Sequence, residues 1–200
     1  MAIQAVIFDA DGMIVMHEPR FSTRLADEYG ITLETTKAFF TGPFQDCVVG
    51  KADLKDELAK FLEGWGWNKG VDAFMALWFL PEGNKIDERI KTVIEQLRAK
   101  GIKTYLATNN EKYRTRNLTE ERGLGAWFDT VFASSSVGAK KPERAFFQHI
   151  IDTTGHTKEG VMFWDDDIIN VQGAEQAGLR ACQYATFDDF KKTLNQEGAL

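Results

Sequence analysis

Residues 5–12 have the sequence Ala5-Val6-Ile7-Phe8-Asp9-Ala10-Asp11-Gly12. A short apolar run that ends at two acids predicts a buried parallel strand leading into a polar loop. The spacing of Asp9 and Asp11 suits phosphoryl transfer, because one carboxylate can attack phosphorus while the other carries a proton to the leaving oxygen. Taken alone, the same residues are as consistent with a polar turn.

Short apolar runs recur along the second half of the chain, and each ends in polar or small residues. They lie at Lys103 to Ala107, Thr130 to Ala133, Val161 to Trp164 and Ala181 to Tyr184. Amphipathic stretches separate the later runs, and one of them, Asp87 to Ala99, ends before Gly101. This alternation predicts an α/β fold with a doubly wound parallel sheet and a ligand site beyond the carboxyl ends of its strands.

The segment between the first strand and the helix at Asp87 is much longer than the roughly 2–6 residues of an ordinary strand-to-helix loop. It contains four stretches with a helical pattern: Arg20 to Tyr29, Leu33 to Phe40, Leu54 to Leu62 and Val71 to Phe79. Its many aromatic residues are expected to form a core of their own. We therefore expect a core domain of residues 1–13 and 81–200, covered by a helical cap of residues 14–80.

Polar residues also follow the second and third apolar runs. Thr108 and Asn109 precede a helix-compatible stretch, where they suit either phosphate oxygens or helix capping. Lys140 and Lys141 precede Pro142, which is expected to start the next helix. One of these lysines could neutralise an aspartate and a phosphate together, or both could be ordinary surface charges.

Three consecutive acids, Asp165, Asp166 and Asp167, follow the fourth run. Their mutual repulsion at the end of a buried strand is tolerated most readily around a bound cation, and hard oxygen ligands favour magnesium. A capping cluster without a metal is the alternative.

In chain order, Asp9-x-Asp11, Thr108-Asn109, Lys141-Pro142 and Asp165-Asp166 resemble the four sequence motifs of the haloacid dehalogenase superfamily. The helical insertion after the first motif resembles the cap of the subclass that contains sugar-phosphate phosphatases and phosphoglucomutases. The resemblance covers nearly the whole chain. An acid at position 11 matches the phosphatases of the superfamily, because its dehalogenases lack that acid and use no metal.

The resemblance implies a role for each matching residue. Asp9 would attack phosphorus, and Asp11 would protonate the leaving alcohol and then activate water. Thr108 and the amide of Asn109 would bind phosphoryl oxygens. Lys141, or Lys140 in the alternative register, would hold Asp9 and the phosphate together.

The cofactor implied by the resemblance is Mg²⁺. It would be held by the carboxylate of Asp9, the backbone carbonyl of Asp11, and Asp166, with Asp165 close by or acting through water. Asp167 stands where a small residue often follows the acidic pair. It therefore remains open which of the three consecutive acids bind the metal.

Met13 departs from the family pattern, and Asn170 matches it. Met13 stands where Thr or Val is usual, and only the packing of the loop is expected to change. Asn170 matches a position that often carries Asp or Asn, and it is expected either to orient a carboxylate or to cap a helix.

Substrate contacts are expected from the cap. His17 and Arg20 follow the first motif closely enough to contribute, although a satisfied histidine and an exposed helix start are the simpler interpretations. Trp67 could stack on a sugar face, or it could belong to the core of the cap. A sugar phosphate is the favoured substrate. A phosphomutase of the β-phosphoglucomutase type and a non-catalytic phosphometabolite-binding module are the alternatives.

Composition limits the possible partners. A net charge of -6 and a pI near 5.2 oppose binding to nucleic acid or anionic lipid, so we expect a small phosphorylated metabolite and no nucleic-acid or membrane partner. Cys47 and Cys182 have no metal-binding or redox spacing. The sequence shows neither a basic and apolar leader nor an apolar stretch of about 20 residues, so a cytoplasmic protein is expected. A monomer or a homodimer is also expected.

Overall fold

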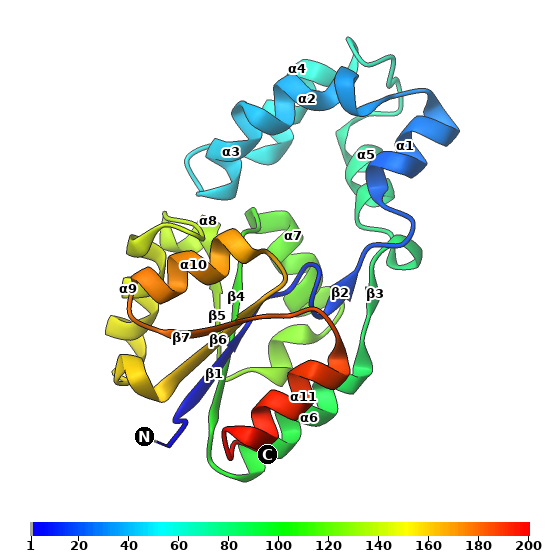
Figure 1. Cartoon of the computed structure of the whole chain (residues 1–200). Coiled ribbons are helices and arrows are strands. Elements are labelled where there is room, and N and C mark those ends of the chain that lie inside the picture. The colour runs from blue at the N-terminus through cyan, green and yellow to red at the C-terminus, as the bar shows by residue number, and fades with distance from the viewer. Residues whose placement is uncertain (1) are drawn as a thin grey trace.

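The computed structural model describes residues 2–200 and contains an α/β core with a group of helices above one end of its sheet (Figure 1). The sheet has five parallel strands in the order β5-β4-β1-β6-β7, which confirms the predicted fold class. The strands are β1 (Ala5–Phe8), β4 (Lys103–Thr108), β5 (Thr130–Ala133), β6 (Val161–Asp165) and β7 (Arg180–Gln183). Because β1 pairs with both β4 and β6, the residues that follow these three strands meet at one edge.

Helices cover both faces of this sheet. One apolar layer packs α6 (Glu88–Ala99), α11 (Phe187–Gln196) and the short turns η2 (Asn117–Glu121) and η3 (Leu124–Trp127) against the strands. The other layer packs α9 (Arg144–Thr154) and α10 (Ile168–Gln176). The remaining short elements of the core are α7 (Lys112–Arg116), α8 (Ser134–Val137) and η4 (Lys158–Gly160).

The prediction that Pro142 starts a helix is wrong, because α9 begins at Arg144. Pro142 lies in a turn in which the N–H of Glu143 donates to the carbonyl oxygen of Lys140 at 2.8 Å. The extended backbone of Glu143 then leads into the helix. The turn keeps Lys141 at the edge of the sheet, outside any helix.

The inserted segment forms five helices with a hydrophobic core of their own. They are α1 (Phe21–Tyr29), α2 (Leu33–Thr41), α3 (Pro43–Val48), α4 (Leu54–Leu62) and α5 (Val71–Trp78). The aromatic residues expected there, such as Phe39 and Phe74, are buried in this core. Helix α3 was not among the four stretches with a helical pattern. Glycine and proline usually interrupt a helix, but Pro43 occupies the first turn of α3, where proline is tolerated.

A two-stranded antiparallel ribbon joins these helices to the sheet. It consists of β2 (Val15–Met16) and β3 (Lys85–Ile86), with the turn η1 (Pro81–Gly83) beside it. Ile14 and Val15 are buried in the core's own apolar layer. We propose that the division into core and cap falls close to this ribbon, and below "the cap" means helices α1 to α5.

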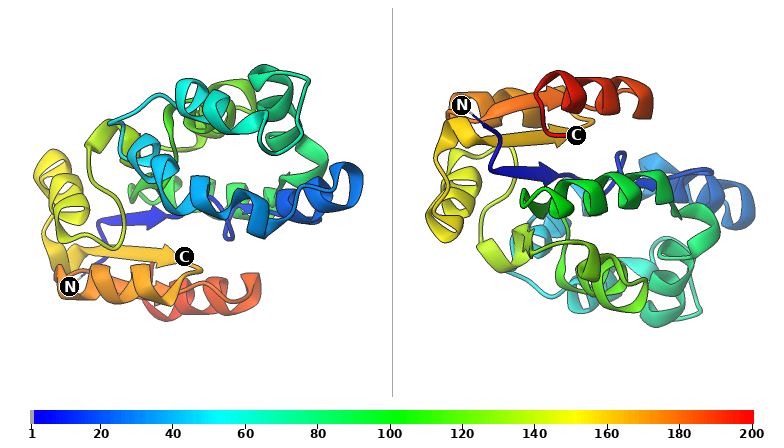
Figure 2. Two further views of the ribbon diagram at one scale, coloured as in Figure 1. Left: turned by 90° about the horizontal axis from the view of Figure 1, so that it is seen from above. Right: turned by 90° about the horizontal axis from the view of Figure 1, so that it is seen from below.

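The cap lies over α7 and to one side of α10 and α11 (Figure 2). Polar contacts join it to the core at the far end from the ribbon. Asp53 accepts hydrogen bonds from Lys112 at 2.5 Å and from the hydroxyl of Tyr113 at 3.0 Å. The hydroxyl of Ser134 donates to the carbonyl oxygen of Val48 at 2.6 Å. The cap is therefore fixed to the core at both ends of the space above the strands.

Among residues 2–200, no helix has both the length and the apolar character that a membrane crossing requires.

Candidate active site

Asp9 follows β1 and lies buried beside Lys141 and Asp165. The ammonium of Lys141 is 2.6 Å from an oxygen of each carboxylate, and 2% of the lysine is exposed. Asn109 fixes the backbone at this point: its side-chain oxygen accepts from the N–H of Lys141 at 2.9 Å, and its side-chain nitrogen donates to the lysine's carbonyl at 2.8 Å. Asn109 thus holds the loop that carries Lys141.

The structure decides between the two adjacent lysines. Lys140 points to the cap, where its ammonium donates to the side-chain oxygen of Gln45 at 2.5 Å. Lys141 is the lysine that lies beside Asp9. The resemblance implied this lysine first, with Lys140 as the alternative.

Three carboxylates converge at the ends of β1 and β6. Oxygen atoms of Asp9, Asp165 and Asp166 all lie within 4.8 Å of one another. Asn170 donates to both oxygens of Asp165, at 3.0 and 3.1 Å, which confirms the expectation that it orients a carboxylate. Asp165 is fully buried, whereas Asp166 is exposed.

Asp167 does not join this cluster. Its side chain caps α10 by accepting from the N–H of Ile169 at 2.9 Å. Asp165 and Asp166, but not Asp167, therefore lie in the carboxylate cluster with Asp9.

The charges of the cluster do not balance. Three carboxylates face one ammonium, that of Lys141, which leaves two negative charges uncompensated when all three carboxylates are ionised. Burial raises the pKa of Asp9 to about 8, against the lowering influence of Lys141. Burial, together with the charge of Asp165, also raises the pKa of Asp166. An all-oxygen set with an excess of two negative charges fits a hard divalent cation such as Mg²⁺.

Asp11 lies in a different environment, among hydrogen-bond donors. His17 Nε2 and Arg114 Nη2 each lie 3.0 Å from its Oδ1, and Asn110 Nδ2 lies 2.6 Å from its Oδ2. Burial opposes ionisation, but these donors together hold the pKa of Asp11 well below its usual range. Asn110 also donates to the hydroxyl of Thr108 at 2.6 Å, so the two predicted site residues Asp11 and Thr108 are joined through one amide.

Three residues of this network were not predicted as site residues. Arg114, 6% exposed, also donates to the side-chain oxygen of Asn84 at 2.8 Å. Glu111 is buried, and its carboxylate accepts from the N–H groups of Tyr113 and Arg114 at the start of α7. Only Asn110 had a sequence signal, because it directly follows Thr108 and Asn109.

A hollow of about 500 Å³ opens between this network and the cap. We call it the polar hollow. Asp11 and Asp166 line it on the core side, and Phe21 and Trp78 line it on the cap side. His17 and Arg20 also line it, so both lie where a substrate group could meet them.

Trp67 does not reach the site, and the prediction that it contacts substrate is wrong. The residue is 5% exposed and belongs to the hydrophobic core of the cap. Its indole N–H donates to the carbonyl oxygen of Gly70 at 2.8 Å, and its ring packs edge-on against Tyr29 and Phe74. A tryptophan with both its face and its N–H engaged has no surface left for a sugar.

Comparison with known proteins gives one consistent family. The model of haloacid dehalogenase-like hydrolases matches residues 3–178. A protein of Mycobacterium tuberculosis that is named a phosphatase is 26% identical over 90% of this chain and 87% of its own length. A Thermotoga maritima protein named phosphorylated carbohydrates phosphatase is 24% identical over 88% of this chain and 82% of its own.

Solved structures agree on the fold. A HAD family enzyme of Bacteroides thetaiotaomicron, solved in complex with magnesium and inorganic phosphate, has a TM-score of 0.81 at 16% identity, covering 96% of this chain and 99% of that one. A HAD-like hydrolase of Porphyromonas gingivalis has a TM-score of 0.82 at 20% identity, covering 98% of each chain.

Proposed function

The chain belongs to the haloacid dehalogenase-like hydrolases, and from that premise we propose that it is a magnesium-dependent phosphatase that hydrolyses a small phosphomonoester through Asp9. One observation carries the proposal: the buried carboxylate of Asp9 lies between Lys141 and two further carboxylates, with an excess of two negative charges. The names of the two relatives above support a phosphatase.

The first half of the reaction transfers the phosphoryl group to the protein. An oxygen of Asp9 forms a bond to phosphorus while the bond from phosphorus to the alcohol oxygen breaks, and Asp11 gives that oxygen a proton. Lys141 stabilises the charge that develops on the phosphoryl oxygens. The hydroxyl of Thr108 and the backbone N–H of Asn109 bind these oxygens, because the side chain of Asn109 is already bonded to Lys141.

The second half returns Asp9 to its starting state. Asp11 takes a proton from water, the water oxygen attacks phosphorus, and the bond between Asp9 and phosphorus breaks to release inorganic phosphate. His17, Arg114 and Asn110 favour the ionised form of Asp11, which is the form that takes a proton from water; the acid step uses the protonated form, which these donors disfavour.

The residues that would hold Mg²⁺ are Asp9, Asp166 and the backbone carbonyl of Asp11. Asp165 lies in the same cluster, but Lys141 and Asn170 already engage its oxygens, so Asp166 has the freer ligand atoms. When bound, Mg²⁺ offsets the negative charge between the attacking carboxylate and the phosphoryl group.

Metal removal tests this assignment. Purified protein should release inorganic phosphate from at least one compound in a panel of hexose phosphates, nucleotides, and alkyl and aryl phosphates when Mg²⁺ is present. Excess EDTA should abolish the release and added Mg²⁺ should restore it, because the cluster keeps two uncompensated charges without a cation. Release that is unchanged by EDTA would contradict the metal assignment. Labelled phosphate recovered on a sugar product would indicate the mutase, and tight binding without turnover would indicate the binding module.

Gly12 offers a second test of the metal site, independent of turnover. It has a φ of +94°, and a Cβ at this position would lie 2.2 Å from an oxygen of Asp166. Gly12→Ala should therefore displace Asp166 and weaken Mg²⁺ binding by roughly 10- to 100-fold, as measured by titration calorimetry.

Gly66→Ala is the matched control. Gly66 has a φ of +78°, but nothing lies within 4 Å of a Cβ there, so the substitution introduces the same backbone strain without the contact. It should leave the dissociation constant for Mg²⁺ unchanged. Equal Mg²⁺ affinity in the two variants would remove Asp166 from the proposed ligands.

A further inference from the structure

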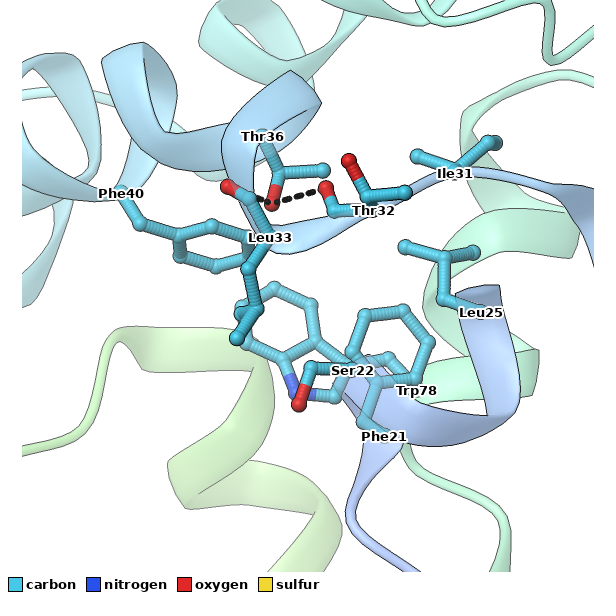
Figure 3. Close-up of a pocket in the computed structure, with 9 residues that line it drawn as sticks. All are labelled: Phe21, Ser22, Leu25, Ile31, Thr32, Leu33, Thr36, Phe40 and Trp78. Carbon is cyan, nitrogen blue, oxygen red and sulfur yellow. Dashed lines mark hydrogen bonds between the residues drawn. The ribbon is translucent and has the colours of Figure 1, made fainter. Parts of the chain in front are cut away.

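A second hollow, of about 220 Å³, opens in the cap among α1, α2 and α5. We call it the apolar hollow. Hydrocarbon side chains form most of its wall, among them Leu25, Ile31, Leu33, Phe40 and Trp78 (Figure 3). Its aromatic side is rigid, because the rings of Phe21 and Trp78 stack at 5.4 Å with an angle of 15° between their planes.

Two threonine hydroxyls in this wall are already engaged. The hydroxyl of Thr36 donates to the carbonyl oxygen of Thr32 at 3.2 Å. The hydroxyl oxygen of Thr32 accepts from the N–H of Thr35 at the start of α2. Among the residues that the structure describes, no charged side chain lines the apolar hollow. The hydroxyls of a sugar would lose water here with few partners in return, whereas a hydrocarbon group would not.

The apolar hollow and the polar hollow are neighbours with a shared wall. Phe21, Ser22 and Trp78 line both of them. Asp11 and Asp166 lie in the wall of the polar hollow, beside the cluster that contains Asp9. A ligand that crosses this shared wall would have one end beside Asp11 and Asp166 and its other end between α1, α2 and α5.

Two of the exposed hydrophobic residues line the two hollows. Among residues 2–200, four large hydrophobic side chains stand out as exposed: Met16, Leu33, Ile168 and Ile169. Met16 lines the polar hollow and Leu33, 68% exposed, lines the apolar one. Ile168 and Ile169 begin α10 directly after the acidic cluster. The exposed apolar side chains of Met16 and Leu33 in the two hollows are consistent with a ligand that has apolar surface.

We propose that the apolar hollow binds the leaving group of the substrate, and that this leaving group is a hydrocarbon chain or ring system carrying its phosphate on a terminal alcohol. The inference rests on the proposed function, because it places the phosphate of the same molecule at Asp9. It replaces a sugar, for which Trp67 was the only structural argument, with an apolar alcohol.

Binding of n-alkylphosphonates tests the proposal without turnover. Methyl- to octylphosphonate would be titrated into the protein with Mg²⁺, and the dissociation constant followed by calorimetry. Each added methylene should lower the dissociation constant roughly fourfold, which corresponds to about 0.8 kcal/mol, until the hollow is filled. Hexylphosphonate should bind more tightly than a hexose 6-phosphate.

Leu33→Asp locates the binding. Leu33 is exposed and opens α2, where an acid suits the helix N-terminus, so the variant should fold. A charge in the wall should flatten the dependence on chain length and leave the affinity for methylphosphonate unchanged. Lys37→Asp is the control: it introduces the same acid on an exposed residue of α2 that does not line the hollow, and it should keep the wild-type dependence.

The outcomes are distinct. A chain-length dependence that Leu33→Asp abolishes and Lys37→Asp keeps supports the proposal. Equal affinities for methyl- and octylphosphonate, an unchanged dependence in Leu33→Asp, or tighter binding of the hexose phosphate would overturn it. Because these are binding measurements, such a failure leaves the phosphatase assignment to be decided separately by phosphate release.

Discussion

Asp9→Asn is expected to lower kcat for phosphate release by at least about 10⁴-fold, because a neutral amide cannot form the bond to phosphorus that the carboxylate forms. The side chain keeps its size and can still accept from Lys141, which lies 2.6 Å from the present carboxylate. The loss should therefore reflect chemistry, with the fold retained. Steady-state phosphate release at saturating substrate and Mg²⁺ measures kcat, and circular dichroism checks the fold.

Asp167→Asn is the matched control for this experiment. It makes the same change in the acidic run after β6, but Asp167 caps α10 and is not part of the carboxylate cluster. Asparagine caps helices about as well as aspartate, so kcat should stay within roughly threefold of wild type. If Asp9→Asn retained as much activity as Asp167→Asn, Asp9 would not be the nucleophile.

The positions of the main site residues could be predicted because they follow buried strands. Apolar runs mark where β1 and β6 end, and parallel strands bring their carboxyl ends to one edge, so Asp9, Asp165 and Asp166 were expected together. The sequence could not decide as firmly which lysine, Lys140 or Lys141, lies beside Asp9. The answer depends on a turn that keeps the chain outside the helix until Arg144, and the sequence favoured a helix from Pro142.

Other parts of the site had no local signal. Arg114 bonds to Asp11 across 103 residues of sequence and to Asn84 across 30, and no periodic pattern encodes contacts of that kind. Trp67 shows the opposite error. A tryptophan in a glycine-rich break suggested an exposed ring, but tertiary packing buries it against Phe74. Which face of the cap meets solvent depends on how its helices pack together.

Lys141→Met is expected to lower the free energy of unfolding by about 3–5 kcal/mol, measured by urea denaturation in EDTA at pH 9, above the pKa of about 8 for Asp9. The lysine side chain is 1% exposed and pairs with both Asp9 and Asp165. Although burial opposes the charge of Lys141, these two carboxylates raise its pKa above the usual value. Removing the ammonium leaves two buried carboxylates facing each other without compensation.

The double variant Lys141→Met, Asp165→Asn should recover part of this loss, because it removes one of the two repelling charges. Mg²⁺ should stabilise the single variant by binding the folded state alone. The loss should also shrink between pH 9 and pH 5. Asp9 has a folded-state pKa raised above its unfolded value, to about 8 even with Lys141 present, so the folded state takes up a proton as the pH falls and the repulsion disappears.

Lys140→Met separates this effect from the general loss of a lysine. Lys140 is only half-buried and its ammonium contacts a neutral amide, that of Gln45, so its removal leaves no buried charge unpaired. It should cost less than about 1 kcal/mol. Equal stability of the Lys140 and Lys141 variants would mean that the carboxylate cluster is not held by Lys141. The excess of negative charge in the cluster would then no longer support the need for a divalent cation.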